Sequence, residues 1–448
     1  MQQNYHSAVQ ERYVGLGHSV MQSFTSIGPM LDLIAVFPLV ALFAGEDFPY
    51  AIIISFLVSF TTINTTYQLS RRFSTNGGYY SYAGKILGKA PGLFVALSYL
   101  AYSIIVLLAI TSFAGYFIFE SMLDFGISSA RTIPFILSAV FIITVFAIVH
   151  LGLKKSLKFT LIAGTAEAAF IIVISLFMFL YPFAGSTVIF PPGNLNSNFL
   201  TGVIFGVLAF SGSGSSIFLS ENSKNPKKTP ADGLALAFLI SGLIMIISSF
   251  AVVAFIGNYL TLYVNNPAAL LADIQQKYGI IFLVPAILFL VLSAMNLSVS
   301  YLNALLKSVK KMFMDNVLYY GKGTGKNSAT SVLLVAVITL ILVLSVLYGP
   351  YNAFVYMSSL AGLFFISVHA FANVALVKTK GRVITTMFLP LVSLIFLAAV
   401  FTVSVWSFAS EFPVIIYMYI VVMILISVYG FVTFTHKEYN RDIEFHVG

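Results

Sequence analysis

Apolar stretches long enough to cross a lipid bilayer recur from one end of this 448-residue chain to the other. Hydrophobic residues make up 59% of the sequence and charged residues only 8%, whereas an ordinary soluble domain is about 25% charged. Each stretch of about 20 apolar residues predicts a transmembrane helix, because a helix of that length matches the hydrocarbon core. We therefore expect an all-α membrane protein that forms one polytopic domain over residues 1–448.

Charge placement gives the predicted topology. The predicted spans are twelve, with soft edges: 19–44, 48–70, 91–119, 132–150, 157–181, 199–220, 231–257, 279–306, 330–348, 352–377, 384–407 and 412–435. An even number places both termini on one side of the membrane. Of the 23 Lys and Arg residues, 21 fall on that side, and only Arg131 and Lys277 fall opposite, so the positive-inside rule makes it the cytoplasm. We expect a multi-pass protein of the cell membrane with both termini cytoplasmic.

The remaining composition excludes several classes of protein. The residues before the first span lack the apolar core and cleavage site of a signal peptide, so that span is expected to stay in the mature protein. The absence of cysteine excludes disulfides and thiolate metal sites, and no cofactor is expected. The net charge of +8 is attributed to the basic cytoplasmic loops that orient the protein in the membrane, so no nucleic-acid partner is expected.

The first and sixth predicted spans are both interrupted by glycine, serine and proline, over residues 24–30 and 210–216. In hydrocarbon every backbone N–H and C=O must be hydrogen-bonded, so unwound chain is tolerated only where it lines a cavity or binds a ligand. One such break alone is best explained by close helix packing. Two breaks at corresponding places in two halves are typical of a secondary transporter, and they favour a binding site.

The spacing of the two breaks predicts the internal symmetry. They lie five spans apart, and because five is odd, two five-span repeats must enter the membrane from opposite sides. This inverted arrangement resembles the LeuT-type fold. It divides the chain into a first repeat at 19–181, a second repeat at 199–377 and two additional helices at 384–435.

Three short motifs add a family resemblance. Residues 76–80, Asn-Gly-Gly-Tyr-Tyr, resemble the Gly-Gly-x-Tyr element of the amino acid-polyamine-organocation (APC) permeases. Residues 210–212, Phe-Ser-Gly, together with the Glu-x-x-x-Asn-Pro-basic-basic pattern at 221–228, resemble the sixth-span motif of the same family. Residues 310–315 weakly resemble its arginine-aspartate loop. The resemblance covers the first ten spans and implies an amino acid transporter, not an enzyme.

The sequence also departs from that family. Many members carry glutamate where Gly214 stands, and the arginine-agmatine exchange branch has a tryptophan at the position of Leu208. Both differences count against a dibasic substrate and favour a neutral amino acid, apolar or aromatic. Residues 26–29, Ser-Ile-Gly-Pro, replace a Gly-Ser-Gly type of break. Proton-coupled members can carry lysine where Glu167 stands, which argues against lysine-based coupling here.

The residues around the breaks form the predicted substrate site. Pro29 suits the first turn of an outer half-helix, whose free N–H groups at Gly28, Met30 and Leu31 could hold a carboxylate. Freed carbonyls and hydroxyls at Ser26 and 210–213 could hold an ammonium group, and an amino acid offers both charges. In the family the third span lines this pocket, which adds Tyr102. The predicted substrate-binding residues are Ser26, Gly28, Pro29, Met30, Leu31, Tyr102, Leu208, Phe210, Ser211, Gly212, Ser213 and Gly214.

Two carboxyl groups fall inside the hydrocarbon, where a central charge costs about 2.5 to 3.5 kcal/mol. Glu167 lies nine residues beyond Lys158, which is roughly 13 Å into the membrane. We expect it to load and release a proton, the alternative being a neutral acid hydrogen-bonded to a neighbouring helix. Asp32 falls in the first turn of the outer half-helix, where the helix dipole favours a carboxylate with or without a substrate contact.

Sodium coupling is the alternative to proton coupling. Ser293 and Asn296 in the eighth span are candidate cation ligands, because in sodium-coupled LeuT-type proteins oxygens from this span and the first hold the ion. His369 in the tenth span is read either as a proton relay or, more often for a lone histidine, as a core residue. The oligomeric state and the particular amino acid are not indicated by the sequence.

Other functional classes lack their motifs. An amino acid or polyamine exchanger remains an alternative within the carrier class. A cation channel or potassium uptake protein would need a filter, and no Thr-Val-Gly-Tyr-Gly-like sequence occurs. No His-Glu-x-x-His, Gly-x-Ser-x-Gly or phosphate-binding loop is found either, which argues against an enzyme or an ATP-driven pump. We therefore expect a secondary amino acid transporter that works by alternating access.

Overall fold

The computed structural model describes residues 12–124, 132–183, 193, 196–266, 268–318, 349–435 and 443–448. The predicted ninth span, 330–348, lies outside these residues, as do Arg131 and Lys322 among the basic residues used for topology. Lys326, Lys437 and Arg441 also lie outside them.

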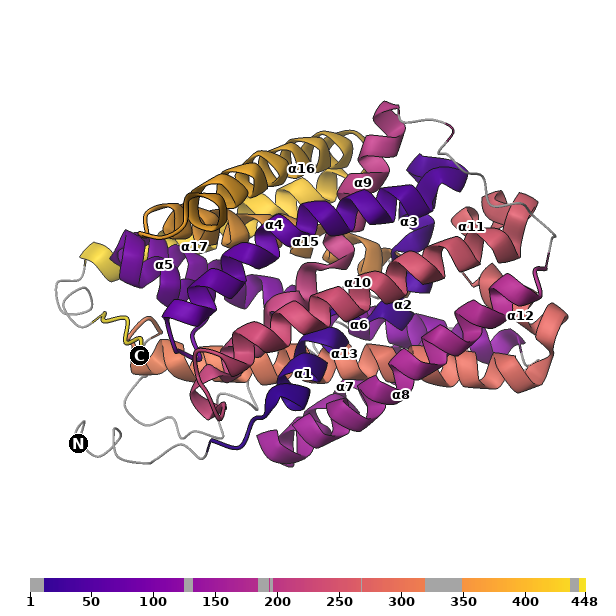
Figure 1. The fold of residues 1–448 in the computed structure, drawn as a ribbon, viewed down its shortest axis with the longest axis horizontal. Coiled ribbons are helices and arrows are strands. Elements are labelled where there is room, and N and C mark those ends of the chain that lie inside the picture. The colour runs from indigo at the N-terminus through magenta and orange to yellow at the C-terminus, as the bar shows by residue number, and fades with distance from the viewer. Residues whose placement is uncertain are drawn as a thin grey trace.

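The described chain is a bundle of long helices that run side by side (Figure 1). The helices are α1 (Leu16–Ile27), α2 (Pro29–Ala35), α3 (Phe37–Ala44), η2 (Gly45–Asp47), α4 (Phe48–Arg72), α5 (Tyr79–Leu87), α6 (Lys89–Asp124), α7 (Ile133–His150), α8 (Leu153–Leu180), α9 (Ser197–Ala209), η3 (Ser211–Asn222), α10 (Thr229–Ile256), η4 (Gly257–Tyr259), α11 (Leu260–Asn265), α12 (Ala269–Tyr278), α13 (Ile280–Met314), α15 (Pro350–Val377), η5 (Ile384–Phe388), α16 (Leu389–Glu411) and α17 (Pro413–Thr435). Proline in the first turn begins α2, α4, α7, α10 and α15, where its missing N–H has no helical partner to lose.

Ten helical stretches of the described residues are long and apolar enough to cross a membrane. The predicted first span is not one continuous stretch, because it is divided into the short helices α1, α2 and α3, and α3 is counted together with α4 in the stretch Phe37–Arg72. The described chain is therefore an all-α membrane protein.

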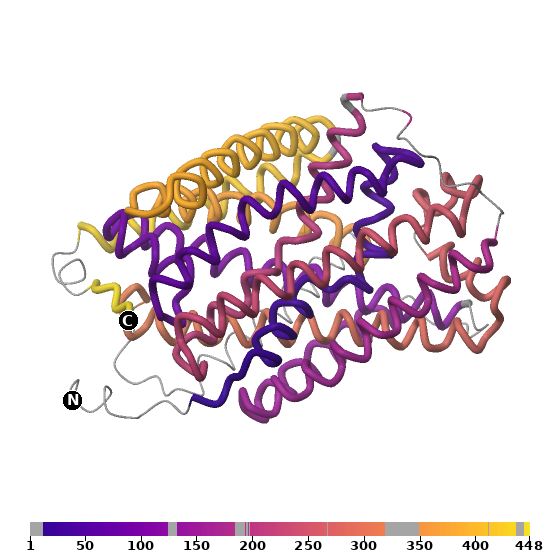
Figure 2. The backbone as a smooth tube through the Cα atoms, viewed as in Figure 1, coloured from indigo at the N-terminus to yellow at the C-terminus, as the bar shows by residue number. Residues whose placement is uncertain are grey.

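The predicted break in the first span is confirmed. Helix α1 ends at Ile27, and Gly28 adopts the left-handed conformation with φ of 74° before Pro29 starts α2. Glycine reaches this conformation without the steric cost of a Cβ atom. A second interruption, which the sequence analysis did not predict, falls at Val36, and Pro38 lies in the first turn of α3. Figure 2 shows the first segment entering the bundle and turning where α3 begins.

The predicted break in the sixth span is also confirmed. Helix α9 ends at Ala209, and after Phe210 the chain continues as the tighter 3-10 helix η3. Residues of a 3-10 helix bond three positions apart, and long runs of it mark functional or strained sequence. Twelve residues of 3-10 helix after the break give the sixth span a second half of unusual geometry.

The two broken segments lie inside the bundle. Helix α1 packs against α8, α10, α13 and η3. Helix α6 packs along α15, and it also contacts α7 and α13. The start of α1 and the C-terminal residues 443–448 lie at the same end of the bundle (Figure 1). At that end, the N–H of Val14 donates to the carbonyl of Asn222 at 3.0 Å, which ties the entry of the first segment to the exit of the sixth.

Candidate functional site

The two breaks meet face to face. Gly212 lies against the backbone of the first segment, where a Cβ atom would overlap the Ser26 carbonyl and lie 2.9 Å from the Ile27 nitrogen. Only glycine allows this approach without moving the chains apart. Next to it, Gln22 Nε2 donates to Ser215 Oγ at 2.7 Å, and the Ser216 N–H donates to Ser23 Oγ at 3.1 Å. The unwound parts of the first and sixth segments therefore share one contact surface.

A small cavity of about 20 Å³, enough for about one or two water molecules, lies beside the sixth-segment break. Its walls come from the start of α5, from α6, from η3 and from α13 and α15. The residues that line it are Tyr79, Tyr99, Tyr102, Ser211, Gly212, Gly214, Ser215, Phe218, Tyr301, Ala304, Phe365, Val368 and His369. Four of the predicted substrate-binding residues, at positions 102, 211, 212 and 214, thus lie together on this cavity.

Aromatic side chains form most of the cavity wall. The Tyr99 ring stacks on Phe218 with centroids 4.5 Å apart. The hydroxyls of Tyr102 and Tyr301 are hydrogen-bonded at 2.6 Å. The walls are therefore closely packed, and no Asp, Glu, Lys or Arg of the described residues lines the space.

Gly214 is explained by the cavity wall. A Cβ atom at this position would overlap the hydroxyl of Tyr79, so the tyrosine occupies the space that a longer side chain at this position would need. Leu208, at the position of the tryptophan gate, faces Gly362 of α15, where an added Cβ atom would meet the leucine methyl groups at 3.4 and 3.5 Å. Neither position brings a charge to the site.

A polar cluster forms around Glu167, which is completely buried. Its Oε1 accepts a hydrogen bond from Ser293 Oγ at 2.6 Å and a longer one from the Met30 N–H at 3.4 Å. Its Oε2 accepts from Asn296 Nδ2 at 3.1 Å. The Leu31 N–H donates to Ser293 Oγ at 3.3 Å. Helices α8, α13 and α2 therefore meet at one carboxyl group.

This cluster changes the role expected for the start of α2. The sequence predicts that the N–H groups of Gly28, Met30 and Leu31 are free to bind a substrate carboxylate. In the structure the Gly28 N–H bonds the Phe24 carbonyl at 3.2 Å, and the other two donate to Glu167 and Ser293. Pro29 stands between them without an N–H. All three donors are thus engaged within the protein.

The remaining predicted residues lie away from the cavity. The Ser26 hydroxyl donates to the Gln22 carbonyl of its own helix at 2.8 Å. Phe210 packs edge-on against Phe238 of α10, with centroids 5.5 Å apart. Ser213 is buried and donates its N–H to the Phe210 carbonyl at 3.3 Å. Asp32 is also buried, and its Oδ2 has no hydrogen-bond partner among the described residues.

Several cavity residues were missed by the sequence analysis. Tyr301 and Phe365 lie on long helices with no local signal of a site. Tyr79 was noted only as part of the Gly-Gly-x-Tyr motif, and that motif was the one signal that could have located it. Phe218 lies beyond the break, against Gly78, whose φ of 61° and closeness to the phenylalanine ring both require glycine.

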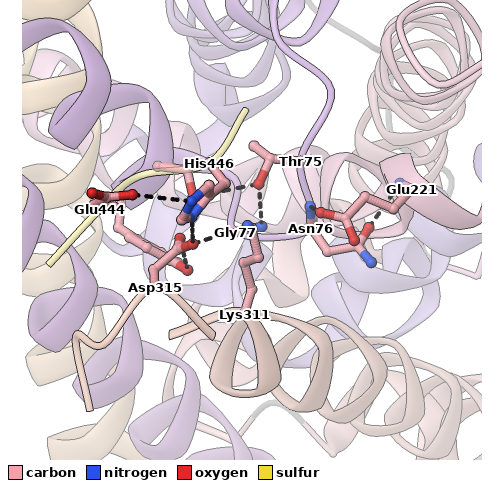
Figure 3. Close-up of polar contacts among 10 residues, drawn as sticks. Thr75, Asn76, Gly77, Glu221, Lys311, Asp315, Glu444 and His446 are labelled. Atoms are coloured by element: carbon pink, nitrogen blue, oxygen red, sulfur yellow. Dashed lines mark hydrogen bonds and ion pairs between the residues drawn. The ribbon is translucent and has the colours of Figure 1, made fainter. Parts of the chain in front are cut away.

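Residues of the Gly-Gly-x-Tyr element, of the 221–228 part of the sixth-span motif and of the 310–315 loop lie close to the C-terminal tail (Figure 3). The Asn76 N–H donates to Glu221 at 3.1 Å, and the Glu221 N–H donates back to the Asn76 side chain at 2.9 Å. Asp315 bonds Lys311 at 2.9 Å and His446 of the C-terminal tail at 3.2 Å. The Tyr80 hydroxyl donates to Asp315 Oδ2 at 3.1 Å, which joins these contacts into one junction.

The tail itself, residues 443–448, is docked on this junction. Ile443 is only 1% exposed, and the Phe445 ring packs against Gly84 and Gly92, where a Cβ atom would overlap it. Gly448 and Ser74 exchange two backbone hydrogen bonds at 2.9 and 3.0 Å. The tail therefore covers this end of the bundle.

An all-α membrane protein whose two broken segments meet beside a buried cavity is a secondary transporter. The sequence matches the amino acid permease family over residues 18–445, and the chain belongs to that family. Its members are transporters, so the protein is not an enzyme.

Among solved structures the chain is similar to MhsT in complex with L-phenylalanine, with a TM-score of 0.62 and 16% identity. This match covers 88% of the present chain and 99% of the other, and it shows a LeuT-like fold. No curated protein matches the chain in sequence.

Proposed function

We propose that the protein carries a neutral amino acid across the cell membrane by alternating access, with both termini in the cytoplasm. The proposal includes twelve spans, of which the first ten form an inverted 5+5 repeat and the last two, α16 and α17 in the described chain, are additional. It rests chiefly on one observation, the contact between Gly212 and Ser26 at the edge of the aromatic cavity.

The cavity wall supports a neutral substrate. A dibasic side chain would need an acidic partner, because a buried unpaired charge is strongly disfavoured. Gly214 and Tyr79 leave no carboxylate at the place where the family often has one. The similar structure contains L-phenylalanine, which supports an aromatic or apolar amino acid for this chain as well.

Glu167 is the proposed proton carrier. An ionised carboxylate only accepts hydrogen bonds, and Glu167 accepts three, from Met30, Ser293 and Asn296. Protonation turns one carboxyl oxygen into a donor that needs an acceptor such as Ser293 Oγ, so the hydrogen bonds of the cluster must rearrange. Because Glu167 lies on α8, Met30 on α2 and the other two donors on α13, a proton on Glu167 would change the contacts among these three helices. Proton loading would thereby be coupled to movement of the half-helix.

Sodium-coupled symport is a second candidate. Asp32 Oδ2 and Asn296 Oδ1 are buried oxygens without a hydrogen-bond donor among the described residues. Oxygen ligands of this kind suit a hard cation, and Ser293 lies in the same cluster. The two candidates differ in which imposed gradient drives uptake.

The test uses purified full-length protein in liposomes with a panel of labelled amino acids and an imposed proton or sodium gradient. We expect saturable, stereoselective uptake of neutral amino acids, accelerated by an inward proton gradient. Glu167→Gln should transport without a response to the gradient. Ser175→Ala is the matched control, because its hydroxyl lies on the same helix and pairs with Ser248 at 2.9 Å, outside the Glu167 cluster. A glutamine variant that keeps the full proton response would refute the coupling role.

A further inference from the structure

The C-terminal tail, residues 443–448, lies in a notch formed by two glycines. Its Phe445 ring lies on Gly84 of α5 and Gly92 of α6, and a Cβ atom at either position would overlap the ring. Any larger residue at these two positions would push the ring out, because packed protein interiors leave no room for additional atoms. The tail therefore occupies a surface that is shaped to receive it.

Polar contacts hold the tail next to this ring. Gly448 and Ser74, which lies in the loop before α5, each donate the backbone N–H to the carbonyl of the other. His446 Nδ1 lies 3.2 Å from Oδ1 of Asp315, the residue that follows α13, and His446 Nε2 lies 3.3 Å from Glu444 Oε2 (Figure 3). The Glu444 N–H also donates to the Asp315 carbonyl at 3.3 Å. The tail thus combines apolar and polar contacts on several elements.

These elements connect the broken sixth segment to the long helices beside it. Ser74 contacts the sixth segment directly, because Ser220 Oγ of η3 donates to the Ser74 hydroxyl at 3.2 Å. Asp315 instead belongs to the end of α13, and the notch under Phe445 includes α6. The tail therefore bridges the exit of η3, through Ser74, to α6 and α13.

Opening of this end requires the bridge to break. A transporter that works by alternating access must separate parts of its bundle at one end while the other end stays closed. The first segment lies between these parts, since Gln22 Nε2 of α1 donates to Ser215 Oγ of η3 at 2.7 Å and to the Ser300 carbonyl of α13 at 2.8 Å. Movement of α1 and η3 away from α13 would separate Ser74 from Asp315, and the tail spans both.

We propose that the tail is a strap that holds the cytoplasmic end of the transporter closed and must detach before that end opens. The docked tail favours the conformation that is closed to the cytoplasm, because its contacts exist only while η3 and α13 are close together. The inference rests on the proposed function, since it requires alternating access and a cytoplasmic C-terminus.

A reversible disulfide tests whether the tail must detach. The chain has no cysteine, and a Cβ atom at residue 448 would lie 3.6 Å from the Ser74 Cβ, a distance that a disulfide spans. The full chain with Ser74→Cys and Gly448→Cys is oxidised in liposomes, and the bond is verified by mass spectrometry. We expect uptake of labelled neutral amino acids to be at least about tenfold slower than after reduction. The wild type and the two single variants are controls, and their uptake should not depend on oxidation.

Labelling of a thiol tests the same claim without transport. Ser300→Cys places one thiol in the contact between α1 and α13, where the buried serine hydroxyl lies 2.7 Å from Thr25 Oγ1. Adding Phe445→Ala should speed labelling by a small thiol reagent at least about fivefold, the factor for a loss of about 1 kcal/mol from the closed state. Phe431→Ala is the matched control, because that ring is 71% exposed on α17, and it should leave the labelling rate unchanged.

The outcomes separate the strap from the proposed function. Cross-linked protein that transports as fast as reduced protein would overturn the strap and leave the transport proposal standing, and so would a labelling rate that Phe445→Ala does not change. Uptake of no amino acid by any form would overturn the transport proposal, and the labelling comparison would still decide whether the tail holds this end closed. If Phe445→Ala does not fold, the cross-link decides, and if the disulfide does not form, the labelling decides.

Discussion

Gly212→Ala tests the contact between the two breaks most severely. The added Cβ would fall inside the ordinary contact distance of the Ser26 carbonyl carbon, its oxygen and the Ile27 nitrogen, which are all backbone atoms. No side chain can rotate to make room, so the segments must separate by about 1 Å or more. Overpacking of this kind costs about 1 to 3 kcal/mol. Because a shift of about 1 Å can cost a hundredfold at a reacting site, we expect uptake to fall at least tenfold.

The assay measures the initial rate of uptake in liposomes, with the amount of folded protein determined by size-exclusion chromatography. Gly17→Ala is the matched control in the first segment, because its Cβ would meet only Leu161 at 3.8 Å. Alanine is favoured over glycine within helices by up to about 1 kcal/mol, so this variant should be as stable as the wild type or more so. Wild-type uptake by Gly212→Ala would refute the claim that the close backbone contact is needed.

Three further perturbations follow from the structure. Gly214→Ala should reduce uptake, because its Cβ would overlap the Tyr79 hydroxyl. Adding Tyr79→Phe to the same chain removes that oxygen and should restore part of the uptake rate. A double variant with no higher uptake than Gly214→Ala would contradict this explanation of Gly214. In thermal unfolding, Glu167→Ala should lower the melting temperature more than Glu167→Gln, because alanine leaves the Ser293 and Asn296 donors without their acceptor. Equal melting temperatures would mean that these hydrogen bonds do not stabilise the fold. Phe445→Ala should cost about 1 to 2 kcal/mol, seen as a melting temperature lower by a few degrees, because it empties the space against Gly84 and Gly92; an unchanged value would mean that the docked tail adds no stability.

The breaks could be predicted because their cause is local. Gly28 and Pro29 determine a left-handed turn and a helix start within two positions, and the glycines at 212 and 214 mark the second interruption. The amino acid permease family could likewise be recognised from short motifs. The interruption at Val36 was missed, although Pro38 two residues later is a local signal of a helix start.

The partners across the bundle could not be predicted. Met30 and Glu167 are 137 positions apart, so no sequence pattern indicated that the N–H groups of α2 already have acceptors. The cavity wall depends in the same way on Tyr301 and Phe365, whose surroundings are fixed only when α13 and α15 pack against α6. Serines within helices gave a misleading signal, because Ser26 bonds its own helix backbone, as hydroxyls in membrane helices commonly do.

Protection of a single thiol by substrate tests the central claim most directly. The chain has no native cysteine, so Ser211→Cys places the only thiol in the protein on the cavity at the sixth-segment break. A transported amino acid at ten times its Kd should slow labelling of this thiol by a small reagent by roughly tenfold, because the unoccupied fraction falls by that factor. A labelling rate that is unchanged by a transported substrate would contradict the account, since it would mean that the substrate binds elsewhere.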